Sequence, residues 1–343
     1  SSVVQNGLTL MIVLFKLGFL KIMKKLPSIS SEIDEKKIFD IINKNFSKIA
    51  PFYYNLITGW LIRSYNVFQD IDKYIILIYL INKDFMFFRK NGLIIDYDTF
   101  YKDKSLEIPK TNISDISNEL RIPKESVRRK VQELEKKGVI KRTGKKIFLD
   151  RSAFITAKAD KTLKEFCLLI NNFNEILAAE KLASKVYNID EVSHSIKKNF
   201  SFCWYQFYKF LFIFTNRWRT TITDLETLTI GLVVMLNSVG NKTFKAKNYS
   251  RQKFHKEIQG IDDIGVNAMS LSDITGIPRA TVVRKIKFLI KNDYLHINDK
   301  KLITLEIKGN TLKTMSKLQE LNMKNLGNFL YRVFNQMKVI NTN

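Results

Sequence analysis

The alternation of hydrophobic and polar positions is clearest between residues 270 and 305. Residues 270–274 predict a short helix in which Leu271 and Ile274 face inward. Residues 275–278 (TGIP) predict a tight turn, because glycine can adopt positive φ and proline suits the first turn of the next helix.

A basic amphipathic helix is expected directly after this turn, over residues 279–290. Its apolar positions recur at spacings of four and three residues, which places them on one buried stripe. They are Val282, Ile286 and Leu289. Two short apolar runs, residues 294–297 and 302–305, flank a polar turn and predict a two-stranded hairpin.

The same order of patterns occurs earlier in the chain. Residues 113–120 predict a first helix, residues 121–123 a turn, and residues 124–137 a second helix. Residues 139–149 predict a hairpin. The inward positions of the second helix are Val127, Val131 and Leu134. Helix, tight turn, basic helix and hairpin form the pattern of a winged helix-turn-helix, and the chain contains this pattern twice.

Both occurrences belong to a longer internal repeat. Segments correspond at an offset of 154 residues, and after one extra residue the offset becomes 155. Corresponding pairs include Tyr54 and Tyr208, Asp70 and Asp224, Arg129 and Arg284, and Lys130 and Lys285. Because the order and the offset are nearly constant along the series, the pattern predicts an internal duplication.

The repeat divides the chain into three expected parts. Residues 1–35 are an apolar N-terminal extension, residues 36–188 the first winged-helix repeat with flanking helices, and residues 189–343 the second repeat with a C-terminal helix. The expected fold is mainly α with small β-hairpin wings, in which two duplicated winged helix-turn-helix domains form a pseudo-dimer. Aromatic-rich runs at residues 52–60 and 204–214 are expected to be buried between helices.

Residues 113–140 and 270–295 resemble the helix-turn-helix of MarR-like and IclR-like bacterial transcriptional regulators. Those families usually have one such unit per chain and form homodimers, so two units in one chain depart from their pattern. Tandem winged helices are similar to those of plasmid replication initiators, although no further match to initiators is found in the sequence.

The positions outside the inward stripes supply cations for phosphates and hydrogen-bonding groups for bases. In the first unit the predicted DNA contacts are Lys124, Glu125, Ser126, Arg128, Arg129 and Lys130, with Lys141, Arg142, Lys145 and Lys146 on the wing. In the second unit they are Arg279, Thr281, Val283, Arg284 and Lys285, with Lys300 and Lys301 on the wing. The family resemblance implies that Ser126 and Thr281 meet the DNA early in the recognition helix, and that Arg129 and Arg284 grip a phosphate or a base.

The two units differ where base specificity is expected. Arg128 of the first unit corresponds to Val283 of the second, and Glu125 corresponds to Ala280. Arginine can pair with guanine and glutamate can accept a hydrogen bond from cytosine, whereas valine and alanine offer only apolar contact, for example to a thymine methyl group. We therefore expect the units to read unlike half-sites.

The net charge supports an acidic partner. The chain carries 57 Lys and Arg residues against 33 Asp and Glu residues, a formal net charge of +24. Such a surplus favours nucleic acid or an anionic membrane surface, although an AT-rich genome also enriches lysine. Together with the two motifs it predicts double-stranded DNA as the partner, bound by an intramolecular pseudo-dimer or by a homodimer. A replication initiator, a nucleoid architectural protein and a protein–protein adaptor remain as alternatives to a transcriptional regulator.

Other classes of function find little support in the sequence. Cys167 and Cys203 lie in apolar runs, which indicates buried thiols and a reducing, cytoplasmic (nucleoid-associated) setting. The three histidines stand alone, so no metal site is predicted. No phosphate-binding glycine loop and no nucleophile–base pair is recognisable, so we expect no enzyme and no cofactor. A small-molecule effector between the aromatic helices is left open.

The N-terminal region contains one membrane-like segment. Residues 8–23 are apolar but are interrupted by Lys16 and Lys21, and the run is shorter than the roughly 20 apolar residues that a spanning helix needs. We expect a packing helix rather than a membrane anchor.

Overall fold

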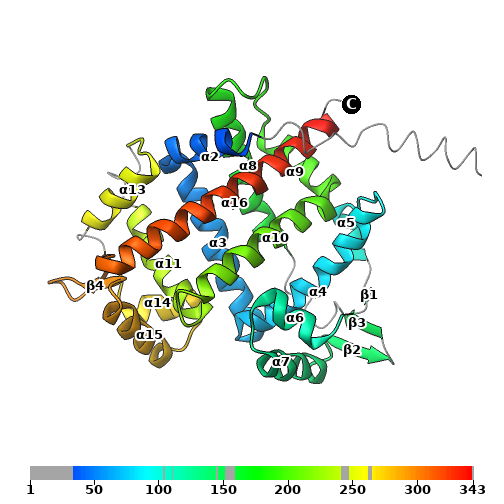
Figure 1. The fold of residues 1–343 in the computed structure, drawn as a ribbon, viewed down its shortest axis with the longest axis horizontal. Coiled ribbons are helices and arrows are strands. Elements are labelled where there is room, and N and C mark those ends of the chain that lie inside the picture. Colours follow the sequence, from blue (N-terminus) through cyan, green and yellow to red (C-terminus); the bar gives the residue numbers. More distant parts are fainter. Residues whose placement is uncertain are drawn as a thin grey trace, which may run out of the picture.

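The computed structural model describes residues 34–102, 105–109, 111–143, 146–150, 159–240, 247–261 and 265–341. The apolar segment at residues 8–23 and the wing residue Lys145 lie outside these ranges. The described part of the chain contains fourteen α-helices and two small antiparallel sheets (Figure 1). The expectation of a mainly helical protein with small β-hairpins is confirmed. No helix in the described ranges is long and apolar enough to cross a bilayer.

The elements of the first half run from residue 35 to residue 179. They are α2 (Glu35–Lys44), α3 (Phe46–Phe68), α4 (Ile71–Lys90), α5 (Tyr97–Lys102), β1 (Ser105–Ile108), α6 (Ile113–Leu120), α7 (Lys124–Lys136), β2 (Ile140–Thr143), β3 (Lys146–Asp150) and α8 (Asp160–Ala179). Strands β2 and β3 form an antiparallel hairpin, and β1 pairs with the other edge of β3. The sequence patterns did not predict β1.

The second half repeats most of this order. Its elements are α9 (Ile189–Lys198), α10 (Phe200–Arg219), α11 (Leu225–Val239), α13 (Arg251–Glu257), the 3-10 helix η2 (Ile258–Gly260), α14 (Ala268–Thr275), α15 (Arg279–Lys291), β4 (Leu295–Ile297), β5 (Ile303–Leu305) and α16 (Gly309–Asn341). Strands β4 and β5 form an antiparallel hairpin. In place of a strand corresponding to β1, Val266 forms a single bridge to Ile303.

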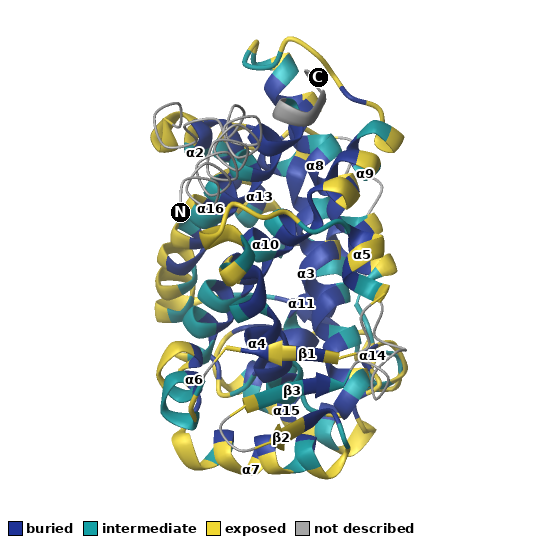
Figure 2. Cartoon of the chain, turned by 90° about the vertical axis from the view of Figure 1, so that its right-hand side faces the viewer, coloured by how far each residue is buried: buried dark blue, intermediate teal, exposed yellow. Residues whose placement is uncertain are grey.

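The aromatic helices α3 and α10 lie in the middle of the molecule and carry much of its core (Figures 1 and 2). Tyr53 and Trp60 of α3 are buried, as are Trp204 and Phe214 of α10, so the expected burial of both aromatic runs is confirmed. Burying large aromatic side chains against each other removes a great deal of apolar surface from water and is the main source of stability in such a core.

The packing of the helices is reciprocal between the two halves. Helix α3 packs against α8 and α11, while its counterpart α10 packs against α16 and α4. Likewise α2 packs against α16, and α9 packs against α8. Each half therefore covers apolar surface of the other, and the two halves share one core.

Two matched pairs of backbone contacts join the halves. The backbone N–H of Ser47 donates to the carbonyl of Tyr249 at 3.1 Å, and the N–H of Tyr249 donates to Ser47 Oγ at 2.7 Å. The corresponding Ser201 donates to the carbonyl of Ile95 at 3.0 Å and accepts from the N–H of Ile95 at 2.9 Å. The same serine thus performs the same task in each half.

One core prediction for the second half is wrong. Ile274 does not face inward, because its side chain is 48% exposed. The inward positions of α14 are Leu271 and Thr275, which lie four residues apart on one face, and Ile274 falls beside that face. Its counterpart in the first half is the exposed Glu119, which forms an ion pair with Lys83.

Candidate nucleic-acid interface

Helices α7 and α15 lie at the same end of the molecule. Both are at the lower edge of Figure 1, and the view turned by 90° in Figure 2 also places both in the lower part. Because the helices beneath them share one core, α7 and α15 belong to the same end of one body.

Each of these helices follows a shorter helix through a tight turn. Arg121 ends α6 with φ of 51°, and Gly276 ends α14 with φ of 74°, so both adopt the left-handed conformation that closes a helix. Pro123 and Pro278 then precede the first residues of α7 and α15 with nearly the same backbone angles. The chain therefore changes direction in the same way in both halves.

Matched hydroxyl groups brace the two turns. Ser117 Oγ donates a hydrogen bond to the carbonyl of Ile122 at 2.7 Å, and Ser272 Oγ donates to the carbonyl of Ile277 at 2.7 Å. At the start of the short helices, the side chains of Asn112 and Asn267 accept hydrogen bonds from backbone N–H groups of the first turn.

The inward stripes of α7 and α15 are buried as predicted. They consist of Val127, Val131 and Leu134 in α7 and of Val282, Ile286 and Leu289 in α15. Of the predicted contact residues on these helices, seven are exposed, the hydroxyl residues Ser126 and Thr281 are half-buried, and Lys130 and Lys285 are buried. The exposed residues are Lys124, Glu125, Arg128, Arg129, Arg279, Val283 and Arg284.

The prediction that Lys130 and Lys285 contact DNA is corrected by the structure. Both lysines are buried, with 9% and 8% of their surface exposed. Lys285 Nζ donates to Asp224 Oδ1 at 2.6 Å, and Lys130 Nζ pairs in the same way with Asp70. Their ammonium groups are directed at the aspartates that cap α11 and α4, so they anchor α15 and α7 to the core instead of facing solvent.

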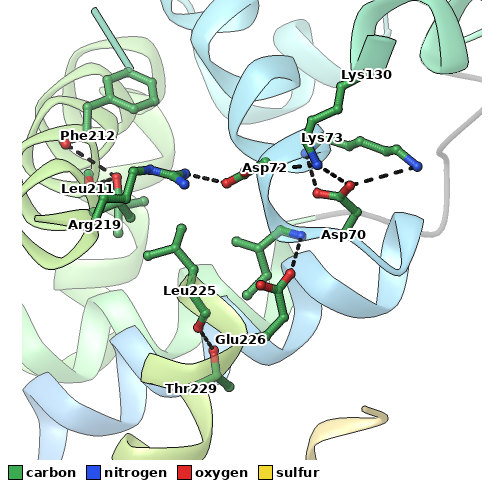
Figure 3. A network of polar contacts seen from close by, with 12 residues as sticks. Asp70, Asp72, Lys73, Lys130, Leu211, Phe212, Arg219, Leu225, Glu226 and Thr229 are labelled. Carbon is green, nitrogen blue, oxygen red and sulfur yellow. Dashed lines mark hydrogen bonds and ion pairs between the residues drawn. The ribbon is translucent and has the colours of Figure 1, made fainter. Parts of the chain in front are cut away.

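The anchor of α7 belongs to a network that crosses between the two halves (Figure 3). Asp72, in the first turn of α4, forms an ion pair with Arg219 at the end of α10. The backbone N–H of Ile71 donates to Glu226 Oε1 at 3.3 Å. The starts of α4 and α11 are therefore joined by side chains from both halves.

The pKa values of two neighbouring carboxylates, Asp224 and Glu226, are shifted in opposite directions. Burial alone would raise the pKa of Asp224, but hydrogen bonds from Lys285 and from the backbone N–H of Thr227 outweigh burial and lower it. Burial raises the pKa of Glu226, and the negative charges of Asp224 and Asp72 raise it further. A cation therefore compensates Asp224, whereas Glu226 meets mainly desolvation and like charge.

On the first unit, four exposed cations among the predicted contact residues are paired with carboxylates. Arg128 Nε donates to Glu125 Oε2 at 3.0 Å, one turn away on the same helix. This hydrogen bond, together with the charge of Arg129, holds the pKa of Glu125 below its usual value. The other pairs join the predicted wing residues Lys141, Arg142 and Lys146 to Asp150, Glu135 and Glu107 respectively.

The wing of the second unit has a different environment. Lys300 and Lys301 are exposed at the turn between β4 and β5, where Lys301 has a positive φ of 59°. Within the described residues, Lys308 forms an ion pair with Glu306, and His296 Nδ1 lies 3.6 Å from the same carboxylate, whereas the two turn lysines take part in neither contact.

Sequence reasoning did not find the anchoring aspartates. Asp70 and Asp224 were matched as a repeated pair, and so were Lys130 and Lys285, but nothing in the local pattern connected the two pairs. The pairing could have been predicted from charge, because both halves carry an acidic and a basic residue at the same two corresponding positions.

His255 packs against Phe46 and Phe254, and both cysteines lie in the core. Cys167 and Cys203 are free and buried, as predicted. Burial lowers the pKa of His255 to about 4, which leaves its imidazole neutral at physiological pH. Among the described residues, no group of three His, Cys, Asp or Glu side chains could hold a metal ion.

No protein-family model matches the chain, and neither a curated protein nor a solved structure matches it.

Proposed function

We propose that this protein is a sequence-specific transcriptional regulator that binds double-stranded DNA. In this proposal, α6, α7 and their hairpin form one winged helix-turn-helix unit, and α14, α15 and their hairpin form a second, non-identical unit. The observation that carries the proposal is that α7 and α15 lie at the same end of the molecule, each with an exposed face that holds cations. Helices of such motifs enter the major groove, and two of them on one face can contact one duplex.

The reciprocal packing supports a pseudo-dimer within a single chain. A homodimeric regulator positions two reading helices by symmetry, and here the matched contacts of Ser47 and Ser201 and of Lys130 and Lys285 serve the same purpose. One chain then supplies both reading helices, and the spacing between them is set by the shared core.

The differences between the reading faces favour a regulator over an architectural protein. Glu125 and Arg128 offer hydrogen-bonding groups for base edges, whereas Ala280 and Val283, both exposed, offer apolar contact. A protein that binds DNA without regard to sequence gains nothing from such a difference. We infer a composite binding site whose two halves are unlike.

Selection from a random duplex library with the full chain, followed by sequencing, tests this function. The expected result is one enriched site with two different halves, centred about 10 base pairs, or one helical turn, apart. Failure to retain any duplex at low salt would contradict DNA binding. Retention without enrichment would contradict sequence specificity.

Point variants locate the reading helices. Arg129→Ala and Arg284→Ala should each weaken binding to the selected site while the circular dichroism spectrum stays unchanged. Lys209→Ala, which removes an exposed cation from α10, is the matched control and should bind like the parent. Parent-like binding by both arginine variants would show that α7 and α15 are not the reading helices.

A further inference from the structure

The two proposed reading helices carry different net charges although they hold equal numbers of cations. Each of α7 and α15 contains five Lys or Arg residues, of which one is the buried anchor lysine. Helix α7 also contains three glutamates, whereas α15 contains no acidic residue. The five cations of α7 are offset by its three glutamates, whereas those of α15 are not, so the surplus of positive charge is larger on α15.

The difference is concentrated on the row of side chains that faces directly away from the protein, which we call the outward row. Positions spaced by four, three and four residues share one face of a helix. In α7 the outward row is Glu125, Arg129, Gln132 and Lys136, and in α15 it is Ala280, Arg284, Lys287 and Lys291. All eight residues are exposed. The carboxylate of Glu125 in α7 thus corresponds to the methyl group of Ala280 in α15, and the amide of Gln132 corresponds to the ammonium group of Lys287.

The two units also differ in how many of their exposed cations are paired with carboxylates. On the first unit, Arg128 pairs with Glu125 and Arg142 with Glu135, and the wing lysines have carboxylate partners as well. On α15, the one ion pair within the described residues is that of the buried Lys285. Within the described residues, the outward cations of both helices form no ion pair, but those of α7 share the row with Glu125, whereas the row of α15 contains no carboxylate.

The difference in charge between the two outward rows implies different roles on a DNA duplex. A protein that neutralises phosphates releases condensed counterions, so its affinity falls with salt in proportion to the number of phosphates it neutralises. Exposed ion pairs are weak and can open, but the released carboxylate stays beside the phosphate and repels it. The reading helix α7 therefore gains less from the DNA backbone than α15 does.

We propose that α15 of the second unit is the electrostatic anchor of the protein on DNA phosphates, and that α7 of the first unit is the selective reader of bases. This division of labour rests on the proposed function. It assigns the phosphate backbone as the main ligand of the outward row of α15, and base edges as the main ligands of Glu125 and Arg128.

Matched double variants of the full chain test the division. Arg284→Ala with Lys291→Ala, and Arg129→Ala with Lys136→Ala, each remove two exposed cations from corresponding positions. Binding to a random-sequence duplex is followed by fluorescence anisotropy over a series of salt concentrations. The α15 variant should lower the magnitude of the negative slope of log K against log salt by about 2. The α7 variant should lower it by less than half as much.

A charge transplant provides the opposite test. Glu125→Ala with Gln132→Lys gives the outward row of α7 the composition of the row in α15. This variant should bind random duplex more tightly and with a steeper salt dependence than the parent, while its preference for the selected site declines.

The outcomes separate this inference from the function on which it rests. A slope change for the α7 double-alanine variant that is half or more of the change for the α15 variant would overturn the division while leaving DNA binding intact. A transplant that leaves random-duplex binding unchanged would also overturn it. A parent chain that binds no duplex even at low salt would overturn the proposed function itself.

Discussion

Lys285 donates a hydrogen bond from its Nζ to Oδ1 of Asp224 at 2.6 Å, and so fastens α15 to the N-terminal end of α11. Asp224 also accepts hydrogen bonds from the backbone N–H and the hydroxyl of Thr227, at 2.7 and 2.8 Å. The carboxylate therefore caps one helix and binds the lysine of another. Lys130 and Asp70 repeat this relationship between α7 and α4. Helices α15 and α7 are thus each joined to the core by one buried lysine.

Removing the charge of Lys285 should destabilise the fold. Breaking a buried ion pair costs about 3–5 kcal/mol when the remaining charge is fully buried. Asp224 is partly exposed and keeps its bonds to Thr227, so Lys285→Met should lower the free energy of unfolding by about 1–3 kcal/mol. Urea denaturation measures this loss.

A neighbouring lysine provides the control for that experiment. Lys287→Met removes an exposed charge from the same helix and should change the unfolding free energy by less than about 0.5 kcal/mol. Adding Asp224→Asn to Lys285→Met should recover part of the loss, because the amide oxygen still caps α11 without leaving a charge unpaired. Equal effects of the two lysine variants would show that Lys285 is not an anchor.

The limits of sequence reasoning are clear from this pair of residues. The stripe of Val282, Ile286 and Leu289 follows from helical periodicity, which is a local property of the chain. Whether a lysine at the edge of the stripe turns inward depends on a partner 61 residues away, and periodicity carries no information about that partner. Lys285 was therefore assigned to the exposed face with Arg284.

Short elements escaped prediction for a related reason. Strand β1 contains four residues, and its stability comes from pairing with β3, about 40 residues later in the chain, through Leu106 with Leu149 and Ile108 with Ile147. Ile274 was placed inward because it is hydrophobic and near Leu271. In a helix as short as α14 the inward face has room for few side chains, and Thr275 takes the position instead.

The raised pKa of Glu226 predicts an unusual dependence of stability on pH. Because burial, Asp224 and Asp72 raise the pKa of Glu226 in the folded state, the folded protein binds this proton more tightly than the unfolded chain does. This contribution to stability is largest at low pH and is lost as the pH rises through the raised pKa. Asp224, whose pKa is lowered, contributes stability that is lost as the pH falls.

Glu226→Gln should separate these two contributions. Glutamine keeps an oxygen that can accept the hydrogen bond from the N–H of Ile71 and carries no charge at any pH. We expect the variant to be more stable than the parent at neutral pH and to lose this advantage as the pH falls below the ordinary pKa of glutamate. Urea denaturation at a series of pH values measures the difference. A variant that is less stable at neutral pH would contradict the assignment.

The turn at Gly276 should not tolerate a side chain. Its φ of 74° lies in the left-handed region, and an added Cβ would come within 2.3 Å of Oδ1 of Asn66. Asn66 donates a hydrogen bond to the carbonyl of Thr275 at 3.3 Å, so the clash would also disturb a contact between the halves. The exposed Asn66 side chain can turn away at the cost of this hydrogen bond, so Gly276→Ala should destabilise the protein by about 2 kcal/mol, of which about 1 kcal/mol is backbone strain.

Gly138 isolates the two causes of that loss. It has the same φ of 74°, but an added Cβ would meet nothing within 4 Å. Gly138→Ala should therefore cost only the backbone strain of about 1 kcal/mol. Thermal or urea denaturation of both variants gives the comparison. If both lost the same free energy, the contact between α14 and Asn66 would have no energetic role.

The two proposed reading helices carry different side chains at the positions expected to contact bases, and exchanging these side chains tests DNA recognition. Ala280→Glu with Val283→Arg places on α15 the pair that α7 carries as Glu125 and Arg128, at the same spacing of three residues. An acidic residue in the first turn of a helix interacts favourably with the helix dipole, so the fold should tolerate the exchange. Because specificity follows the groups presented to the base edges, the half-site bound by the second unit should come to resemble that of the first. Library selection with this variant should return a more nearly palindromic site than selection with the parent. An unchanged site would mean that these four positions do not read bases, and that the two halves of the operator are distinguished elsewhere on the protein.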